Sequence, residues 1–283
     1  MAAAIEAMGG GRAMSAVAER RVFSRLRMPG GIFKTTSARR LTDVDAATVD
    51  ALPAPGSTLA AIDVGASSGT TAVELVTALA TAGHRVRMTM TDISLTARQL
   101  RVHPGYTVLV DAETRLLQHI VLGVPIRPWR RRLDYVTQFW LATGAANRWH
   151  ARMAANGAID RALQGATLVL LVAPAAAEHP DIACEEGDVF APPPANHRAA
   201  FDIVRAANLL LPEVFSTERI VTALEHLKAR LRGPGSLLVL ARSPAPGRPG
   251  SNRATIYRLN AEDRLEVAAR IGGGCDIEAL AGT

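Results

Sequence analysis

Short apolar runs alternate with amphipathic stretches over much of the chain. The run 59–64 is apolar and leads into a glycine-rich turn, so it predicts a buried strand. The segment 71–81 then has its apolar residues at helical spacing, at Val73, Leu75, Val76 and Leu79. A second strand is predicted over 85–91, and it closes on Asp92. A strand–helix–strand unit of this kind requires a crossover connection, so it predicts a parallel sheet.

The same alternation returns in the last third of the chain. Further strands are predicted over 182–190, 201–204 and 236–241, and the run 166–173 fits either a strand or the flank of a helix. The segment 216–232 predicts a long amphipathic helix that begins at the cap Ser216 and ends at Gly233. The runs 254–259 and 265–271 predict a final antiparallel pair of strands.

Residues 95–165 interrupt this alternation. All three tryptophans lie in the stretch, at Trp129, Trp140 and Trp149. Its apolar run 116–124 is short and contains His119, which favours a core helix over a membrane contact. We interpret 95–165 as an insertion that shapes a substrate pocket or a lid, with an ordinary extra helical layer as the alternative.

The ends of the chain differ from the rest. Residues 1–56 predict a basic N-terminal extension with helices over 13–28 and 43–52, the second capped by Asp43. Residues 57–275 form the predicted α/β domain, and 276–283 a C-terminal tail.

The composition limits which cellular setting and which binding partners are expected for the protein. The net charge is +6, with basic clusters between 20 and 40 and between 127 and 132. Such clusters suit an anionic substrate or peripheral contact with an acidic membrane. Nucleic-acid binding is not predicted, because the sequence has no basic strand interleaved with aromatic residues.

Cys184 and Cys275 are too few and too far apart for a metal site, and favour a reducing, cytoplasmic setting. No run is apolar enough to predict a membrane span or a signal peptide.

A glycine-rich loop follows the first predicted strand. Its sequence is Asp63-Val64-Gly65-Ala66-Ser67-Ser68-Gly69. Gly65 permits a tight turn, and Gly69 permits close approach where the next helix starts. Alone, such a loop is a weak signal of ligand binding, and a purely structural tight turn is the alternative.

Two carboxylates favour a ligand-binding function for this loop over a purely structural one. Asp92 ends the next strand, where an acidic side chain can accept hydrogen bonds from both hydroxyls of a ribose. Asp188 ends a later apolar segment and can accept from an adenine amino group, while Val189 covers the ring. All these groups belong to the carboxyl edge of the predicted sheet, where open α/β proteins bind ligands.

With these residues, the chain resembles the class I S-adenosylmethionine-dependent methyltransferases. The loop 63–69 is similar to their first motif, with Ser67 in place of the usual middle glycine. Asp92 matches their ribose-binding position, and Gly187-Asp188-Val189-Phe190 is similar to their adenine-contacting segment. The segment 201–240, including Asn208, resembles the region of their fourth and fifth strands.

The resemblance implies a fold, a cofactor and a reaction. The fold is a Rossmann-like, mostly parallel sheet of about seven strands, with helices on both faces and an antiparallel last strand. The cofactor is S-adenosyl-L-methionine (SAM). Its implied ligands are Asp63, Gly65, Ser67, Gly69, Asp92, Ile93, Asp188, Val189 and Asn208. The reaction is methyl transfer to an oxygen or nitrogen atom of a small substrate.

Several candidates for the chemistry remain open. A general base could be His119 or His150, and Asn208 could orient either the substrate or the methionine end of the cofactor. Arg127, Trp129 and Arg130 could receive a carboxylate or phosphate of the substrate. An NAD(P)-dependent oxidoreductase and a methyltransferase-like binding protein without catalysis are the alternative functions. No metal is predicted.

Overall fold

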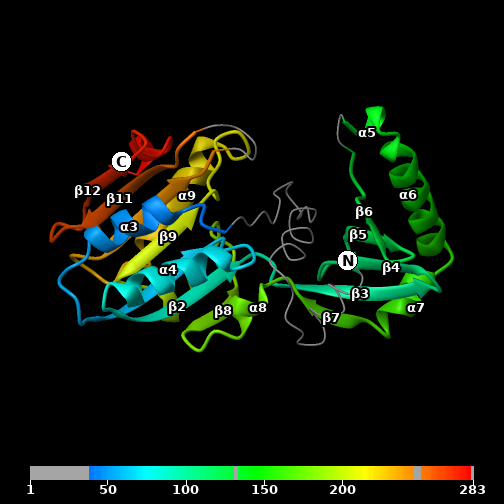
Figure 1. Cartoon of the computed structure of the whole chain (residues 1–283), viewed down its shortest axis with the longest axis horizontal. Helices are drawn as coiled ribbons and strands as arrows, with labels where there is room; N and C mark the ends of the chain where they lie inside the picture. The colour runs from blue at the N-terminus through cyan, green and yellow to red at the C-terminus, as the bar shows by residue number, and fades with distance from the viewer. Residues whose placement is uncertain (1–37, 131–132, 245–249, 282–283) are drawn as a thin grey trace. The chain divides into compact units, whose positions relative to one another are not determined.

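The computed structural model describes residues 38–130, 133–244 and 250–281 (Figure 1). The chain divides into two compact units. Residues 37–93 and 175–283 belong to one, which we call the parallel-sheet unit, and residues 94–174 belong to the other, the inserted unit. The predicted helix over 13–28 lies outside the described residues.

The parallel-sheet unit has a seven-stranded sheet in the order β12-β11-β10-β9-β1-β2-β8. The strands are β1 (Thr58–Val64), β2 (Arg85–Asp92), β8 (Ile182–Glu186), β9 (Ile203–Ala207), β10 (Leu237–Arg242), β11 (Arg253–Leu259) and β12 (Leu265–Ile271). The five strands from β8 to β10 are parallel, and β11 is antiparallel to both of its neighbours. The mostly parallel sheet is thus confirmed. The antiparallel strand is β11 and not, as predicted, the last strand. The chain reverses direction again after β11, so β12 runs parallel to β10.

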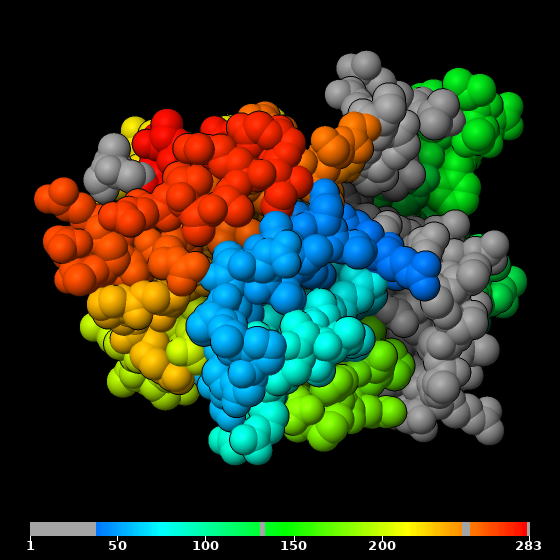
Figure 2. Space-filling model, turned by 60° about the vertical axis from the view of Figure 1, so that its left-hand side comes forward, coloured from blue at the N-terminus to red at the C-terminus, as the bar shows by residue number. Residues whose placement is uncertain are grey.

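Helices cover both faces of this sheet. On one face, α9 (Thr217–Lys228) buries Leu224 in a core cluster that also contains Ile62 of β1 and Leu238 of β10. Side chains alternate along a strand, so the neighbours of these residues in each strand point to the other face of the sheet. There α3 (Thr42–Asp50) packs beside α4 (Thr70–Thr81) and reaches β12, as Figure 2 shows.

The strand order places a switch point at β1. One crossover leads from β1 through α4 to β2, while β9 lies on the other side of β1. In open α/β sheets, the crevice at the carboxyl ends of such strands is the place where ligands bind. The loop 65–69 leaves β1 at this position.

Both predicted ends of the domain need correction. Helix α3 belongs to the parallel-sheet unit rather than to a separate extension. Asp43 lies within α3 and is not its cap, because the helix already begins at Thr42. The C-terminal residues are no tail, since Ile277 is buried in the core and Glu278 begins a short 3-10 helix (Glu278–Leu280) that pairs with Arg270.

The inserted unit is a five-stranded antiparallel sheet in the order β6-β5-β4-β3-β7. Its strands are β3 (Thr96–His103), β4 (Tyr106–Val110), β5 (Leu116–Val121), β6 (Val124–Ile126) and β7 (Thr167–Leu170). Its helices are α5 (Leu133–Val136), α6 (Phe139–Ala155) and α7 (Ala158–Leu163). Next in the sequence come the short helix α8 (Pro174–Ala177), at the boundary of the two units, and η1 (Ala195–His197) of the parallel-sheet unit.

The core helix predicted over 116–124 is wrong. Those residues form β5 and the start of β6, joined by a tight turn at Leu122 and Gly123. Both turn residues have positive φ, +49° and +78°, which is the hairpin geometry that matches strand twist. Leucine is an unusual residue for that conformation, so the turn is hard to recognise from sequence. No helix within 38–130, 133–244 and 250–281 is long and apolar enough to cross a membrane.

A buried ion cluster joins β1, β9 and α3 in the parallel-sheet unit. Arg205 of β9 is fully buried. Its Nε and Nη2 donate to the two carboxylate oxygens of Asp63, at 3.0 and 2.6 Å, and its Nη1 donates to Asp45 at 2.8 Å. The cluster satisfies charges that would otherwise be costly to bury, and it ties α3 to the sheet.

The buried carboxyl of Asp45 gives the free energy of unfolding a distinctive pH dependence. Burial raises its pKa to about 6, with Arg205 opposing the rise and Asp63 adding to it. An unfolded aspartate titrates near pH ~3.9, so between these values only the folded protein keeps the proton. This contribution to stability is present below pH ~4 and is lost as pH rises to about 6, by about 1–3 kcal/mol.

Urea unfolding between these pH values checks this expectation. Asp45→Asn removes the decline in stability, whereas Asp50→Asn, an exposed aspartate of the same helix, leaves it unchanged. An equal decline in wild type and Asp45→Asn would contradict the assignment.

Candidate cofactor-binding site

The loop between β1 and α4 is held in an unusual backbone conformation. Gly65, Ser67 and Gly69 have φ values of +73°, +62° and +81°. The amides of Gly65 and Ala66 both donate to Thr91 of β2, at 2.8 and 3.0 Å. Alternate left-handed residues fold the chain back at the end of β1, so the loop curls over the carboxyl edge of the sheet.

Both glycines are also needed for packing. A β-carbon on Gly65 would lie 2.8 Å from Leu209 Cδ1, and one on Gly69 would lie 2.7 Å from the β-carbon of Ala176. Ser67 has the left-handed φ without being glycine, which costs roughly 1–2 kcal/mol. Leu209 had no predicted role, and its only signal in the sequence is its place after Asn208 in the strand-end segment.

Asp92 lies at the loop, as predicted from its place at the end of β2. One carboxylate oxygen accepts from the amide of Ser67 at 2.8 Å, and the residue is 9% exposed. Ile93 follows it with 60% of its surface exposed. A carboxylate beside an exposed aliphatic side chain is a suitable pair for a ribose and the ring attached to it.

The second predicted carboxylate is arranged differently. Asp188 follows β8 and is exposed, and its side chain accepts from the amide of Phe190 at 2.9 Å. Val189 is 5% exposed and packs in the core against α9, where His226 Nδ1 lies 3.1 Å from its carbonyl. Asp188 therefore presents a carboxylate to solvent, whereas Val189 has little surface with which to cover a ring.

Asp63 also departs from its expected role. Both of its oxygens accept from Arg205, on the face of the sheet that α3 covers. This carboxylate therefore balances a buried charge beneath the loop instead of facing a ligand.

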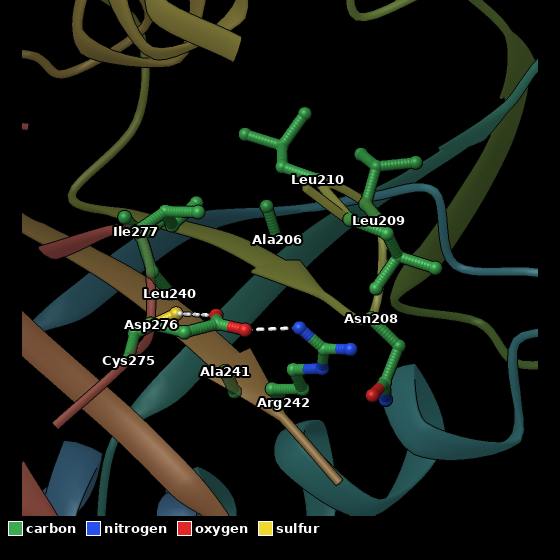
Figure 3. Close-up of a pocket in the computed structure, with 11 residues that line it drawn as sticks. Ala206, Asn208, Leu209, Leu210, Leu240, Ala241, Arg242, Cys275, Asp276 and Ile277 are labelled. Atoms are coloured by element: carbon green, nitrogen blue, oxygen red, sulfur yellow. Dashed lines mark hydrogen bonds and ion pairs between the residues drawn. The ribbon is translucent and has the colours of Figure 1, made fainter. Parts of the chain in front are cut away.

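Asn208 joins the ends of two strands. It follows β9 with a φ of +54°, and its Oδ1 accepts from the amide of Ser243, just after β10, at 2.7 Å. Beside it, Figure 3 shows a cavity in which Arg242 pairs with Asp276. The cavity has a volume of about 10 Å³, enough for one water molecule but not for a nucleoside. Asn208 therefore has a structural role at this edge of the sheet.

His119, a predicted base, is fully buried in the inserted unit. Asn147 donates through Nδ2 to the carbonyl of Pro128, so its Oδ1 accepts from His119 Nε2 at 2.7 Å. The other ring nitrogen then accepts from the hydroxyl of Tyr106 at 3.0 Å. Burial lowers the pKa of His119, which keeps the ring neutral, and both nitrogens are already engaged.

The other predicted residues of the inserted unit lie near its helices. His150 is the edge-on neighbour of His119, with ring centroids 5.8 Å apart, and burial lowers its pKa. Arg127 pairs with Asp134 at 2.6 Å and lies 4.7 Å from the ring of Trp129. Arg130 is exposed. Arg127 is thus held by an internal partner, while Arg130 is turned to solvent.

No protein-family model and no curated protein matches the chain. Solved structures similar to it include the CMeT domain of the citrinin polyketide synthase, at 15% identity and a TM-score of 0.37, covering 80% of this chain and 39% of that one. SAM-bound CalS10, an amino pentose methyltransferase from Micromonospora echinaspora, matches at 14% identity and 0.35, covering 88% and 71%. Phosphoethanolamine N-methyltransferase 1 from Haemonchus contortus matches at 14% and 0.36, covering 83% and 35%.

The chain spans between 31% and 53% of the length of the first three structures that it matches. Many of the matched structures are SAM-dependent methyltransferases of several kinds, with no single subfamily among them. The matched structures also include one described as putative Zn-dependent alcohol dehydrogenases from Rhodobacter sphaeroides, at 13% identity and a TM-score of 0.32, covering 85% of this chain and 53% of that one.

Proposed function

We propose that this chain is a SAM-dependent methyltransferase that binds its cofactor at the loop 65–69. The observation that carries the proposal is the position of Asp92. Its carboxylate lies at hydrogen-bond distance from the loop, at the carboxyl edge and next to the switch point of a parallel sheet. The exposed aliphatic side chain of Ile93 lies next in sequence.

The hydrogen bonds of the loop favour SAM over a dinucleotide. A pyrophosphate in a Rossmann-type site binds amides at the turn and at the start of the helix. Here the amides of Gly65, Ala66, Ser67 and Gly69 all donate within the chain. SAM has no pyrophosphate, and its single carboxylate requires fewer donors than a pyrophosphate does. This supports methyl transfer over the NAD(P)-dependent alternative.

The residues present fit SAM in part. Asp92 would hold the ribose hydroxyls, Ile93 would cover one side of the adenine, and Asp188 would accept from its amino group. Gly65 and Gly69 keep the loop free of side chains. SAM supplies an electrophilic methyl group, and the protein's own task is to orient the acceptor in line with it.

The acceptor is an oxygen or nitrogen atom of a small molecule in this proposal. A base among the engaged histidines is not required where the acceptor is already nucleophilic, since orientation alone lowers the barrier substantially. His119 would then act only by supporting the inserted unit, through Tyr106 and Asn147.

Asp92→Asn tests the proposed role of Asp92. Asparagine can still accept from Ser67, so the loop is retained, but the charge that receives the two ribose hydroxyls is lost. We expect the dissociation constant for S-adenosylhomocysteine to rise about tenfold or more, because hydrogen bonds to charged groups contribute about 1.5–3 kcal/mol. Calorimetric titration measures the change.

The matched control is Asp181→Asn, an exposed aspartate that precedes β8, at the opposite edge of the sheet. It should leave the affinity unchanged. Equal affinities of Asp92→Asn and wild type, with both proteins folded by circular dichroism, would reject the ribose role of Asp92.

A further inference from the structure

The outer surface of α5 and α6 in the inserted unit combines exposed apolar side chains with arginines. We call it the α5–α6 surface, and its members are Arg130, Tyr135, Val136, Leu141, Arg148 and Arg152. Tyr135, Val136 and Leu141 are 60%, 80% and 48% exposed. Large apolar side chains grouped on a surface in this way mark an interaction site.

The helical period of α6 shows that these residues form one face. Leu141, Arg148 and Arg152 are exposed and recur at helical spacing, with the exposed Ala145 between them. Thr143 is buried on the opposite side of the helix. The exposed face of α6 is therefore continuous from an apolar end to a basic end.

Two further residues extend this face along one flank. Tyr135 of α5 lies against Trp140, with ring centroids 6.3 Å apart and an angle of 24° between the rings. A β-carbon placed on Gly144 would lie 3.5 Å from Arg130 Nη2 and 3.9 Å from Arg148 Nη2. Two guanidinium groups from different segments thus converge over a glycine.

These arginines have no acidic partner among the residues that the structure describes. Residues 94–174 contain ten arginines, no lysine and only four acidic residues. Three of the four acidic residues pair with Arg115 and Arg127. Within the described ranges, Arg130, Arg148 and Arg152 make no ion pair, and α6 itself has no acidic residue. Among the described residues, the surface therefore carries an excess of positive charge.

We propose that the α5–α6 surface docks on an anionic lipid membrane. The arginines would meet lipid phosphates and carboxylates, while Val136 and Leu141 would enter the boundary of the acyl chains. Tyrosine and tryptophan beside them are the residues preferred at that depth. The charge and the exposed aliphatic groups are both complementary to a membrane of this kind.

A nucleic acid would use the same arginines but not the same apolar groups. Bases stack on open aromatic faces, and here Tyr135 and Trp140 each turn one face toward the other, so Val136 and Leu141 are the groups that distinguish the two partners. Exposed valine and leucine gain most from transfer into an apolar phase, which a nucleic acid does not offer. The combination therefore favours a membrane, and it assigns Arg130 to this surface rather than to the substrate.

Vesicle sedimentation of the full chain tests the proposal. At about 0.1 M salt, the protein should sediment with phosphatidylcholine vesicles that contain about 30% phosphatidylserine, and not with pure phosphatidylcholine vesicles. Leu141→Gln and the double variant Arg148→Glu/Arg152→Glu should each weaken binding, the double variant about tenfold or more.

Matched controls separate this surface from general charge and apolarity. Arg85→Glu/Arg87→Glu makes the same charge change on exposed residues of the parallel-sheet unit, and Leu168→Gln removes another exposed leucine of the inserted unit. Both should bind vesicles like the wild type.

Three results would overturn the proposal. One is no sedimentation with phosphatidylserine vesicles, and another is equal weakening in the controls. The third is tighter binding to a single-stranded RNA oligomer than to vesicles, with no effect of Leu141→Gln.

Discussion

Replacing Arg205 with methionine is expected to lower the free energy of unfolding by about 3–5 kcal/mol. The side chain is fully buried, and it donates to both oxygens of Asp63 and to Asp45. Methionine keeps most of the volume and removes the charge. Two buried carboxylates are then left without their cation, and at neutral pH their desolvation is no longer offset.

The control for Arg205→Met is Arg232→Met. Arg232 also pairs with an aspartate, Asp202, but the arginine side chain is 50% exposed. An exposed pair of this kind contributes about 0–1 kcal/mol. Urea unfolding at neutral pH compares the two variants.

A triple variant identifies the cause of the loss. Adding Asp45→Asn and Asp63→Asn to Arg205→Met removes the stranded charges and should restore part of the stability. If Arg205→Met costs no more than Arg232→Met, the buried cluster does not have the stabilising role assigned to it.

Gly69→Ala is expected to cost about 2–4 kcal/mol of stability. Two effects add. The left-handed φ of +81° is unfavourable for any residue with a β-carbon, and the new methyl group would lie 2.7 Å from Ala176 Cβ and from Met90 Sδ. To relieve these two contacts, Ala176 of α8 and Met90 of β2 must move away from the loop.

Gly56→Ala separates the two effects. Gly56 also has a left-handed φ, +106°, but a β-carbon there would meet no atom within 4 Å. Its loss of stability should therefore report backbone strain alone, about 1–2 kcal/mol. Thermal unfolding of both variants measures the difference, and equal losses would show that close packing at Gly69 contributes nothing.

The elements around the loop could be predicted because local signals agree there. The run 59–64 is apolar on both faces, as a central parallel strand requires, and Gly65 follows it directly. The spacing in 71–81 is helical, and Asp92 follows a second strand. Each signal is local, so the order of the elements and the position of Asp92 at the loop follow from the sequence.

The inserted unit could not be predicted in the same way. Its strands are short apolar runs, and periodicity does not distinguish such runs from buried helix segments. The turns that join them use Leu122 and Gly123 or Gly105, rather than an Asn-Gly pair. Long-range antiparallel pairing, as between β3 and β7, leaves no local signal at all.

Arg205 carries a further signal that is present in the sequence of β9. A charged residue in the middle of the apolar run Ile203-Val204-Arg205-Ala206-Ala207 requires a buried partner. Asp63 is the matching acidic residue in the neighbouring strand, directly opposite in the register. The sequence contains both charges, but only the strand order shows that they pair. For that reason the sequence pattern predicts a cofactor role for Asp63, and the structure shows an ion pair instead.

Calorimetric titration of the full chain with SAM, S-adenosylhomocysteine and NAD tests the proposed cofactor most directly. We expect one molecule of SAM or S-adenosylhomocysteine to bind per chain, with a dissociation constant of about 1 μM to 1 mM, the range usual for enzyme substrates. NAD should produce no binding heat. Binding of NAD in place of SAM, or no SAM binding up to millimolar concentration, would contradict the assignment of the loop 65–69 to SAM.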